Sequence, residues 1–190
     1  MNDVCGCRIV AFLALSVLVA APAMAFERAD SMDDFGPFAR EVLGSVPTSG
    51  VCVFVAPRSP VLPLALARNG AQVVHCLEGD ASACDSLRKA MREAGLYGQV
   101  SVTAWSPPYL PHVDDLVNVI VVPDWPAAAK AGLTVKEVLR ALAPLGTAWL
   151  GGAVDAREVS AQAKAASAGT QTVDAKTGQA WLKLSNPWPA

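Results

Sequence analysis

Apolar runs and amphipathic stretches alternate along this sequence. Five runs rich in valine and other apolar residues are typical of strands that are buried on both faces. They are Val51–Ala56, Ala71–Leu77, Val100–Trp105, Leu116–Val122 and Gly146–Leu150. Helical spacing of apolar residues marks residues 35–43, 61–68, 80–94, 134–142 and 156–166. Two short final runs, Thr170–Val173 and Ala180–Leu184, predict a terminal β-hairpin.

This order of elements predicts the fold class. Parallel strands need crossover connections, and right-handed crossovers place helices on both faces of a sheet. We therefore expect an α/β fold, namely a Rossmann-like, doubly wound and mainly parallel sheet with a C-terminal antiparallel hairpin. Val51–Ala56 is expected to be a central strand. Sheets of this kind bind ligands at the carboxyl ends of their strands, so candidate site residues are sought there.

The first 25 residues have the layout of a cleavable signal peptide. A polar stretch ends in Arg8, an uncharged apolar run covers residues 9–21, and Ala23-Met24-Ala25 supplies small residues before Phe26. The apolar run is shorter than the roughly 20 residues that cross a bilayer, so a permanent anchor is the weaker alternative. We expect an exported protein, periplasmic or secreted, with no membrane span after cleavage. One α/β domain would cover residues 26–185, followed by a Pro-rich tail at 186–190.

The net charge limits the kinds of partner that the chain is expected to bind, and the cysteine content limits the expected disulfide and metal sites. The formal net charge is −2 without a basic block, which argues against nucleic acid or an anionic membrane surface. Cys52, Cys76 and Cys84 lie beyond the signal. We expect Cys52 and Cys76 to be buried strand residues, with a disulfide between two of the three cysteines as the alternative. The chain has only two histidines, so a structural zinc site is not expected.

A longer pattern joins the third and fourth apolar runs. Residues 100–122 read VSVTAWSPPYLPHVDDLVNVIVV, and residues 139–146 read LRALAPLG before the fifth run. In register and order, Leu110-Pro111, Asp114 and Val117-Asn118-Val119 resemble the third-strand, loop and fourth-strand pattern of class I S-adenosylmethionine-dependent methyltransferases. The resemblance covers nearly all of Val51–Leu184 and implies their Rossmann-like fold with a closing antiparallel hairpin.

A narrower likeness rests on residues 95–102, GLYGQVSV, and on Asn186-Pro187-Trp188-Pro189. By these residues the chain is similar to methyltransferase-like modules that precede quinoprotein-like β-propellers in planctomycete-type bacteria. The resemblance then implies a free-standing or truncated version of such a module.

The resemblance implies S-adenosylmethionine as the cofactor and a glycine-rich turn after the first strand, where backbone approaches the cofactor closely. This turn falls on residues 53–59, VFVAPRS, and Val55, Pro57 and Ser59 stand where the cofactor-binding glycines are expected. The acidic residue of the motif is also missing. Pro57 restricts the backbone and removes a donor, and Val55 adds a branched side chain. The cofactor site is therefore predicted to be degenerate.

The resemblance implies two further cofactor contacts. A carboxylate at the end of the second strand would bind the ribose hydroxyls, and Glu78 fits with a shift of one residue from the aligned Leu77. Asp80 fits with a larger shift. The alternative is that Asp80 caps a helix and Glu78 is a solvated loop charge. Ser106 stands where an acidic or amide residue would contact adenine, and Trp105 before it either stacks on a ring or closes the core.

Other polar motifs carry weaker predictions. Ser106-Pro107-Pro108-Tyr109 spells a signature of amino-group methyltransferases, but it follows the third predicted strand instead of the fourth and is interpreted as a turn. Asp124-Trp125-Pro126 follows the fourth strand and is either a substrate contact or a Pro-bounded turn. His75 is expected to be a core residue and His112 a loop residue without a partner motif. No residue is assigned a catalytic role, and no metal is expected.

Three functions stay open. The first is a methyltransferase-like domain with a degenerate cofactor site that serves as a scaffold or interaction module, with an unknown protein or small molecule as its partner. The second is an active S-adenosylmethionine-dependent methyltransferase with an atypical first loop, acting on an unknown substrate. Export weighs against it, because the cofactor is kept in the cytoplasm. The third is a related domain that binds another ligand, or none, at the same strand ends.

Overall fold

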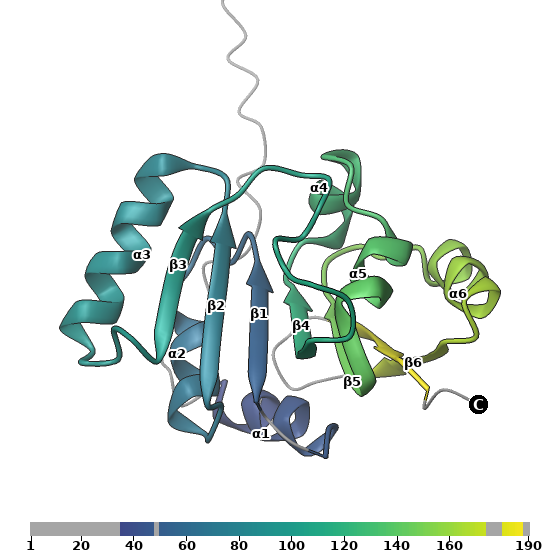
Figure 1. Ribbon diagram of the computed structural model, residues 1–190, viewed down its shortest axis with the longest axis horizontal. Coiled ribbons are helices and arrows are strands. Elements are labelled where there is room, and N and C mark those ends of the chain that lie inside the picture. Colours follow the sequence, from purple (N-terminus) through teal and green to yellow (C-terminus); the bar gives the residue numbers. More distant parts are fainter. Residues whose placement is uncertain (1–34, 48–49, 174–179, 188–190) are drawn as a thin grey trace, which may run out of the picture.

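The computed structural model describes residues 35–47, 50–173 and 180–187, which form a sheet between two layers of helices (Figure 1). The strands are β1 Val51–Val55, β2 Val73–Glu78, β3 Val100–Ala104, β4 Val117–Val122, β5 Leu142–Leu150, β6 Gly169–Val173 and β7 Trp181–Ser185. The helices are α1 Gly36–Gly44, α2 Val61–Arg68, α3 Ala81–Glu93, α4 Trp125–Lys130, α5 Val135–Ala141 and α6 Ala156–Ala165. The predicted signal peptide, residues 1–25, lies outside the described residues.

The strands follow the order β3-β2-β1-β4-β5-β7-β6. Strands β1 to β5 are parallel, whereas β7 is antiparallel to both β5 and β6. Strand β1 pairs with β2 on one side and β4 on the other, as expected for a central strand. The predicted fold class is therefore confirmed: a doubly wound, mainly parallel sheet with a C-terminal antiparallel hairpin.

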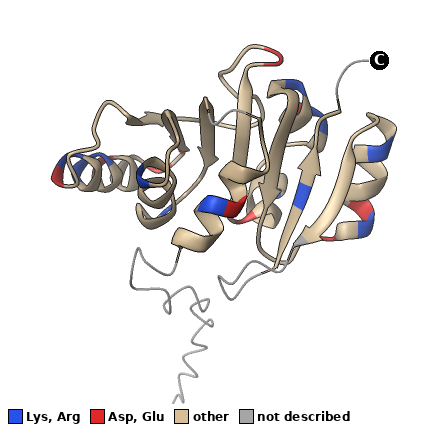
Figure 2. Ribbon diagram, turned by 90° about the horizontal axis from the view of Figure 1, so that it is seen from below, with Lys and Arg blue, Asp and Glu red and all other residues tan. Residues whose placement is uncertain are grey.

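Alternate residues of the inner strands build two separate cores. In β1, Cys52 and Phe54 join the core formed with α1, α2 and α3, whereas Val53 and Val55 join the core formed with α4, α5 and α6. All four side chains are fully buried, because a parallel strand covered on both faces needs apolar residues at every position. Charged side chains lie mostly on the surrounding helices and loops (Figure 2).

Several observed elements differ from the prediction, among them β2, which covers Val73–Glu78 instead of Ala71–Leu77. Strand β5 begins at Leu142, because Leu142 pairs with Val117 before the register of the two strands shifts. Strand β3 ends at Ala104, which leaves Trp105 outside the strand. The short helix α4 was missed: the side chain of Asp124 caps it, so Asp124-Trp125-Pro126 begins a helix instead of a plain turn.

The connection from β3 to β4 contains no helix. Residues 105–116, all of them described, form an irregular segment that we call the strap, and it crosses one face of the sheet (Figure 1). Leu110 of the strap is 4 % exposed and packs into the core shared with α5. Arg140 of α5 donates to the carbonyls of Leu110 and His112 and to the carboxylate of Asp114, at 3.2, 2.9 and 2.6 Å. Polar anchors on α5 thus hold the strap in place.

Cys52, Cys76 and Cys84 are buried and unpaired. The prediction of buried strand thiols is confirmed for Cys52 and Cys76, and the disulfide alternative is wrong. Among the described helices, none combines the length and the apolar character that a membrane crossing requires.

Candidate functional site

The strands β1, β2, β3 and β4 end along one edge of the sheet, where the loops that follow them meet. The N–H of Ala56 donates to the carbonyl of Leu77 at 2.7 Å, and the N–H of Trp105 donates to the carbonyl of Glu78 at 2.9 Å. These bonds tie the segments after β1 and β3 to the end of β2. The same edge carries every residue predicted to contact a cofactor, namely Val55, Pro57, Ser59, Glu78 and Ser106.

The turn after β1 has a backbone of the kind that favours glycine, yet it contains no glycine. Ala56 and Arg58 have φ angles of 49° and 52°. This left-handed region costs a residue with a side chain roughly 1–2 kcal/mol. The glycines implied by the resemblance were placed at Val55, Pro57 and Ser59, none of which has a positive φ. The two left-handed residues lie between these predicted positions.

The residues at the predicted glycine positions serve the fold. Val55 is fully buried in the core shared with α4 to α6, and Pro57 is also buried. The Ser59 hydroxyl accepts a 3.4 Å hydrogen bond from the N–H of Val61, the first residue of α2. Side chains therefore occupy the place where a glycine-rich turn would offer bare backbone.

Glu78 is the last residue of β2 and is only 5 % exposed. Its Oε2 accepts from the N–H of Arg58 at 3.3 Å, and its Oε1 accepts from the N–H groups of Gly79 and Asp80 at 2.9 and 3.2 Å. The alternative of a solvated loop charge is wrong, because the carboxylate is buried. Glu78 instead joins the turn after β1 to the turn after β2.

These residues do not fit S-adenosylmethionine. Ribose hydroxyls need an accessible carboxylate, whereas the Glu78 carboxylate is buried against backbone N–H groups of its own chain. The turn that would approach the cofactor contains no glycine, and the side chains of Val55 and Pro57 within it are buried.

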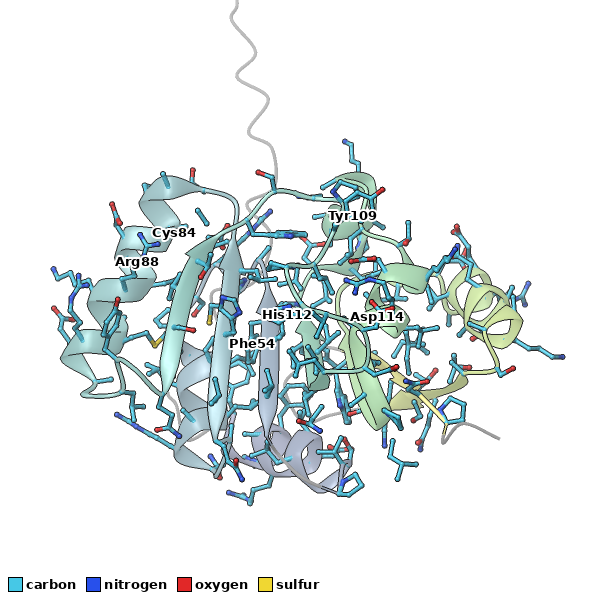
Figure 3. The ribbon with its side chains drawn as sticks, in the orientation of Figure 1. Phe54, Cys84, Arg88, Tyr109, His112 and Asp114 are labelled. Carbon is cyan, nitrogen blue, oxygen red and sulfur yellow. The ribbon has the colours of Figure 1, made fainter. Side chains whose placement is uncertain are left out.

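The residues that follow β3 form the first part of the strap. Ser106, the predicted adenine contact, is exposed. Trp105 is 9 % exposed, and its indole N–H donates to the carbonyl of Tyr109 at 2.7 Å, which favours the interpretation of Trp105 as a residue that closes the core. The Tyr109 side chain is 73 % exposed and lies beside α4 (Figure 3). The Ser-Pro-Pro-Tyr motif thus lies after β3, where it was expected to form a turn.

Two other carboxylates at this edge cap helices. Asp80 accepts from the N–H of Ala83 at 2.7 Å and from the Ser82 hydroxyl at 2.8 Å. The Ala83 hydrogen bond is the main reason why the pKa of Asp80 lies below its ordinary value. Asp124 accepts from the N–H of Ala127 at 3.1 Å at the start of α4. The helix-cap interpretation of Asp80 is confirmed, and a substrate contact at Asp124 stays a prediction.

The structure brings together two histidines that the sequence did not link. Nδ1 of His75, in β2, lies 3.0 Å from Nε2 of His112, in the strap. The sequence contains no partner motif for His112, but the strap carries this residue onto a strand 37 residues away in sequence. Burial, then the neighbouring His75 and then the charge of Arg140 lower the pKa of His112 to about 4. Burial also lowers the pKa of His75, so both rings are neutral at pH 7.

The thiols are poor candidates for nucleophiles or ligands. Burial raises the pKa of Cys52 to about 12 and also raises the pKa values of Cys76 and Cys84. A buried thiol that stays protonated is unreactive. Within the part of the chain that the structure describes, no three His, Cys, Asp or Glu side chains are grouped so that they could hold a metal ion.

No family model matches the sequence, and no curated protein is detectably similar to it. Solved structures are similar in fold. A putative S-adenosyl-L-methionine-dependent methyltransferase from Methanococcus maripaludis has a TM-score of 0.63 at 14% identity, over 83% of this chain and 87% of that one. A SAM-dependent methyltransferase from Aquifex aeolicus has a TM-score of 0.63 at 13% identity, over 82% and 93% of the two chains. This chain has the class I methyltransferase fold.

The methyltransferase fold does not decide the chemistry of this protein. The [4+2]-cyclase SpnF has the same fold, with a TM-score of 0.66 at 14% identity over 83% of this chain and 81% of that one. It is named for a cyclisation and not for methyl transfer. At such identities the likeness establishes the fold alone, and function must be argued from the site.

Proposed function

We propose that this chain is an exported methyltransferase-fold domain that has lost its cofactor site and acts as a scaffold or interaction module. The observation that carries the proposal is the role of Glu78. Its buried carboxylate accepts hydrogen bonds from the backbone N–H groups of Arg58, Gly79 and Asp80. The carboxylate expected to bind ribose therefore stabilises two turns of its own chain.

The loss of a few contacts is enough to abolish cofactor binding. A Kd of 100 μM corresponds to about 5.5 kcal/mol of binding free energy. Each missing hydrogen bond or buried unpaired polar group costs about 1–3 kcal/mol. The turn after β1 and the ribose carboxylate together account for two or three such losses. We therefore expect no measurable S-adenosylmethionine binding at concentrations near 100 μM.

Calorimetric titration of the chain from Phe26 to Ala190 with S-adenosylmethionine, and separately with S-adenosylhomocysteine, tests the proposal. We expect heats equal to those of dilution. A variant combining Val55→Gly, Pro57→Gly, Ser59→Gly and Leu77→Asp restores the family's residues and should recover some binding. Micromolar binding by the unmodified chain would contradict the degenerate-site proposal.

Two further sets of substitutions, chosen from the structure, sharpen the same titration. Ala56→Gly with Arg58→Gly removes the side chains from the two left-handed residues and should ease the turn without changing Glu78. Adding Glu78→Gln to a variant that has gained binding should abolish the gain if ribose is held by the carboxylate. An equal gain with Glu78→Gln would show that the carboxylate has no part in binding.

The alternative is an active S-adenosylmethionine-dependent methyltransferase with an atypical first loop. The placement of Glu78 at the end of β2 and the left-handed backbone of the turn after β1 favour it. The same titration separates the two functions, because an active enzyme must bind its cofactor. Its substrate would be sought among ligands that reach Ser106 and Asp124.

Export rests on the signal-peptide layout of residues 1–25. Mass spectrometry of protein from the native cell envelope should detect a chain that begins at Phe26, and a full-length chain in the cytoplasm would contradict export. The likeness to modules that precede quinoprotein-like β-propellers belongs to the same proposal, and it supports a structural role beside another domain.

A further inference from the structure

The two histidines belong to a short hydrogen-bonded chain on the face of the sheet that carries the strap. Nδ1 of His75 lies 3.0 Å from Nε2 of His112, and Nε2 of His75 lies 2.9 Å from Oγ1 of Thr103 in β3. The remaining ring nitrogen, Nδ1 of His112, is buried and has no hydrogen-bond partner among the described residues. The ring of His112 lies over the middle of the sheet (Figure 3).

This arrangement selects one neutral tautomer of the pair. A neutral imidazole carries one N–H donor and one bare acceptor nitrogen. A buried N–H without an acceptor is rarer in proteins than an unused acceptor. We therefore assign the His112 proton to Nε2, which donates to Nδ1 of His75, and the His75 proton to Nε2, which donates to Thr103. In this state each ring proton has a partner.

No additional proton fits into the closed pair. A proton added to His112 makes Nδ1–H a buried donor without an acceptor. A proton added to His75 turns both of its nitrogens into donors, so Nε2 of His112 must be bare and the His112 proton must move to Nδ1. Both routes end with the same unsatisfied Nδ1–H. The strap must move before His112 can find an acceptor for it.

The charges around the pair do not offset this cost. Strand β3 has no ionisable side chain, and the only one in β1 is Cys52, which lies in the core of the other face. In β2, Glu78 is bound to the turns at the end of the strand. The strap supplies Asp114 and Asp115, and Asp114 is paired with Arg140. On α5, the Glu137 carboxylate is paired with the same Arg140.

We infer that His75 and His112 form an acid-sensitive latch, which holds the strap on the sheet while both rings are neutral and releases residues 111–116 when the pair takes up a proton. The His112 pKa is lower in the folded chain than the ordinary 6.5. The contribution of the latch is thus complete above about pH 6.5 and is lost as the pH falls toward about 4. This inference does not depend on whether the protein binds S-adenosylmethionine.

A second anchor should limit the opening to one part of the strap. The N–H of Leu110 donates to Oε1 of Glu137 at 2.8 Å. Hydrogen bonds from Arg140 hold the pKa of Glu137 below its ordinary value of 4.5, so this carboxylate is ionised at pH values above about 4.5. We therefore expect Leu110 to stay in the core at mild acidity, while the segment around His112 and the exposed Val113 leaves the sheet. This release also breaks the hydrogen bonds from Arg140 to the His112 carbonyl and to the Asp114 carboxylate.

Nuclear magnetic resonance of the untagged chain from Phe26 to Ala190 tests the latch directly, because its only histidines are His75 and His112. Long-range proton–nitrogen correlations should show His112 with its proton on Nε2 at pH 7.5. Titration of the ring signals should give His112 a pKa below 5. An Nδ1–H tautomer, or an ordinary pKa near 6.5, would overturn the inference, and neither measurement requires a variant.

Hydrogen exchange measured by mass spectrometry tests the release. After correction for intrinsic rates, amides at 112–116 should lose at least tenfold protection between pH 7 and pH 4.5, while those of β4 stay unchanged. The matched control is His112→Gln, whose amide can donate to His75 Nδ1 but cannot take up the proton. In that variant the acid-induced loss should disappear. An equal loss in His112→Gln and the unmodified chain would overturn the latch.

Discussion

Two consecutive connections cross opposite faces of the sheet and are stabilised in different ways. Helix α3 joins β2 to β3 and buries Cys84, Leu87 and Met91 at helical spacing. The strap joins β3 to β4 without a helix, and polar contacts from α5 and β2 hold it. A crossover connection can therefore be stabilised either by a periodic apolar stripe or by a few long-range hydrogen bonds. Only the first leaves a periodic pattern in the sequence.

The largest expected effect tests the apolar connection. Leu87 is 1 % exposed, and Leu87→Ala should lower the free energy of unfolding by about 2–5 kcal/mol, because it removes buried methyl groups and leaves a cavity. Urea denaturation followed by circular dichroism measures the change. Lys89→Ala, on the exposed side of the same helix, is the control and should change stability by less than about 0.5 kcal/mol. Equal effects of the two substitutions would contradict the apolar-stripe account.

A smaller effect is expected at the main polar anchor of the strap. Glu137 is 8 % exposed and accepts from the N–H of Leu110 at 2.8 Å and from Arg140 at 2.7 and 2.9 Å. Glu137→Gln should cost about 2 kcal/mol, because it weakens charge-assisted hydrogen bonds and leaves a partly buried guanidinium less well paired. Hydrogen exchange should locate the loss in the strap, with little change in α3. The control is Asp114→Asn, at an exposed ion pair worth at most about 1 kcal/mol.

Because the Glu137 carboxylate must be ionised to hold the strap, we expect the stability of this anchor to depend on pH. Hydrogen bonds from Arg140 and from the N–H of Leu110 hold the Glu137 pKa below its ordinary value of 4.5. Its contribution is therefore present above about pH 4.5 and is lost as the pH falls through the lowered pKa. In Glu137→Gln, the slope of stability against pH should be flatter below pH 4.5 than in the unmodified chain. An unchanged slope would contradict the role of Glu137 as an ionised anchor.

The smallest effect tests the helix that carries the anchor. The Thr134 hydroxyl accepts from the N–H of Glu137 at 3.1 Å and caps α5. Thr134→Ala should cost about 1 kcal/mol of stability, as at other N-caps, and Thr134→Ser should cost a few tenths. Thermal unfolding of the two variants measures the difference. If the strap is independent of α5, Thr134→Ala should leave hydrogen exchange at 105–116 unchanged.

At the start of α5, the role that the sequence pattern indicates for Glu137 differs from the role that the structure shows. Residues 134–137 read TVKE and have the spacing of a reciprocal capping box, in which the glutamate bonds back to the start of the helix. The Thr134 half is present, but the Glu137 carboxylate binds Leu110 and Arg140 instead. A competing donor from the strap, the N–H of Leu110, therefore changed the use of Glu137. Local spacing cannot reveal such a competitor, because the strap lies far from Glu137 in sequence.

The candidate site shows the same division. The sequence places Val55, Pro57, Ser59, Glu78 and Ser106 after the ends of predicted strands, and the structure collects them along one edge of the sheet. The sequence does not reveal that the Glu78 carboxylate accepts from the N–H of Arg58, because that hydrogen bond depends on how the turn after β1 folds back. Nor does it reveal the left-handed backbone of Ala56 and Arg58, since neither residue type favours it.

By itself, the sequence determined the layers of this protein and the order of its elements. Valine-rich runs and apolar stripes at helical spacing are local signals, and burial acts on each of them separately. Only the tertiary structure decided which polar groups meet: Glu78 with the turn after β1, Glu137 with the strap, and His75 with His112. These contacts join residues 20, 27 and 37 positions apart. Their geometry depends on the path of the chain between them, which no local periodicity encodes.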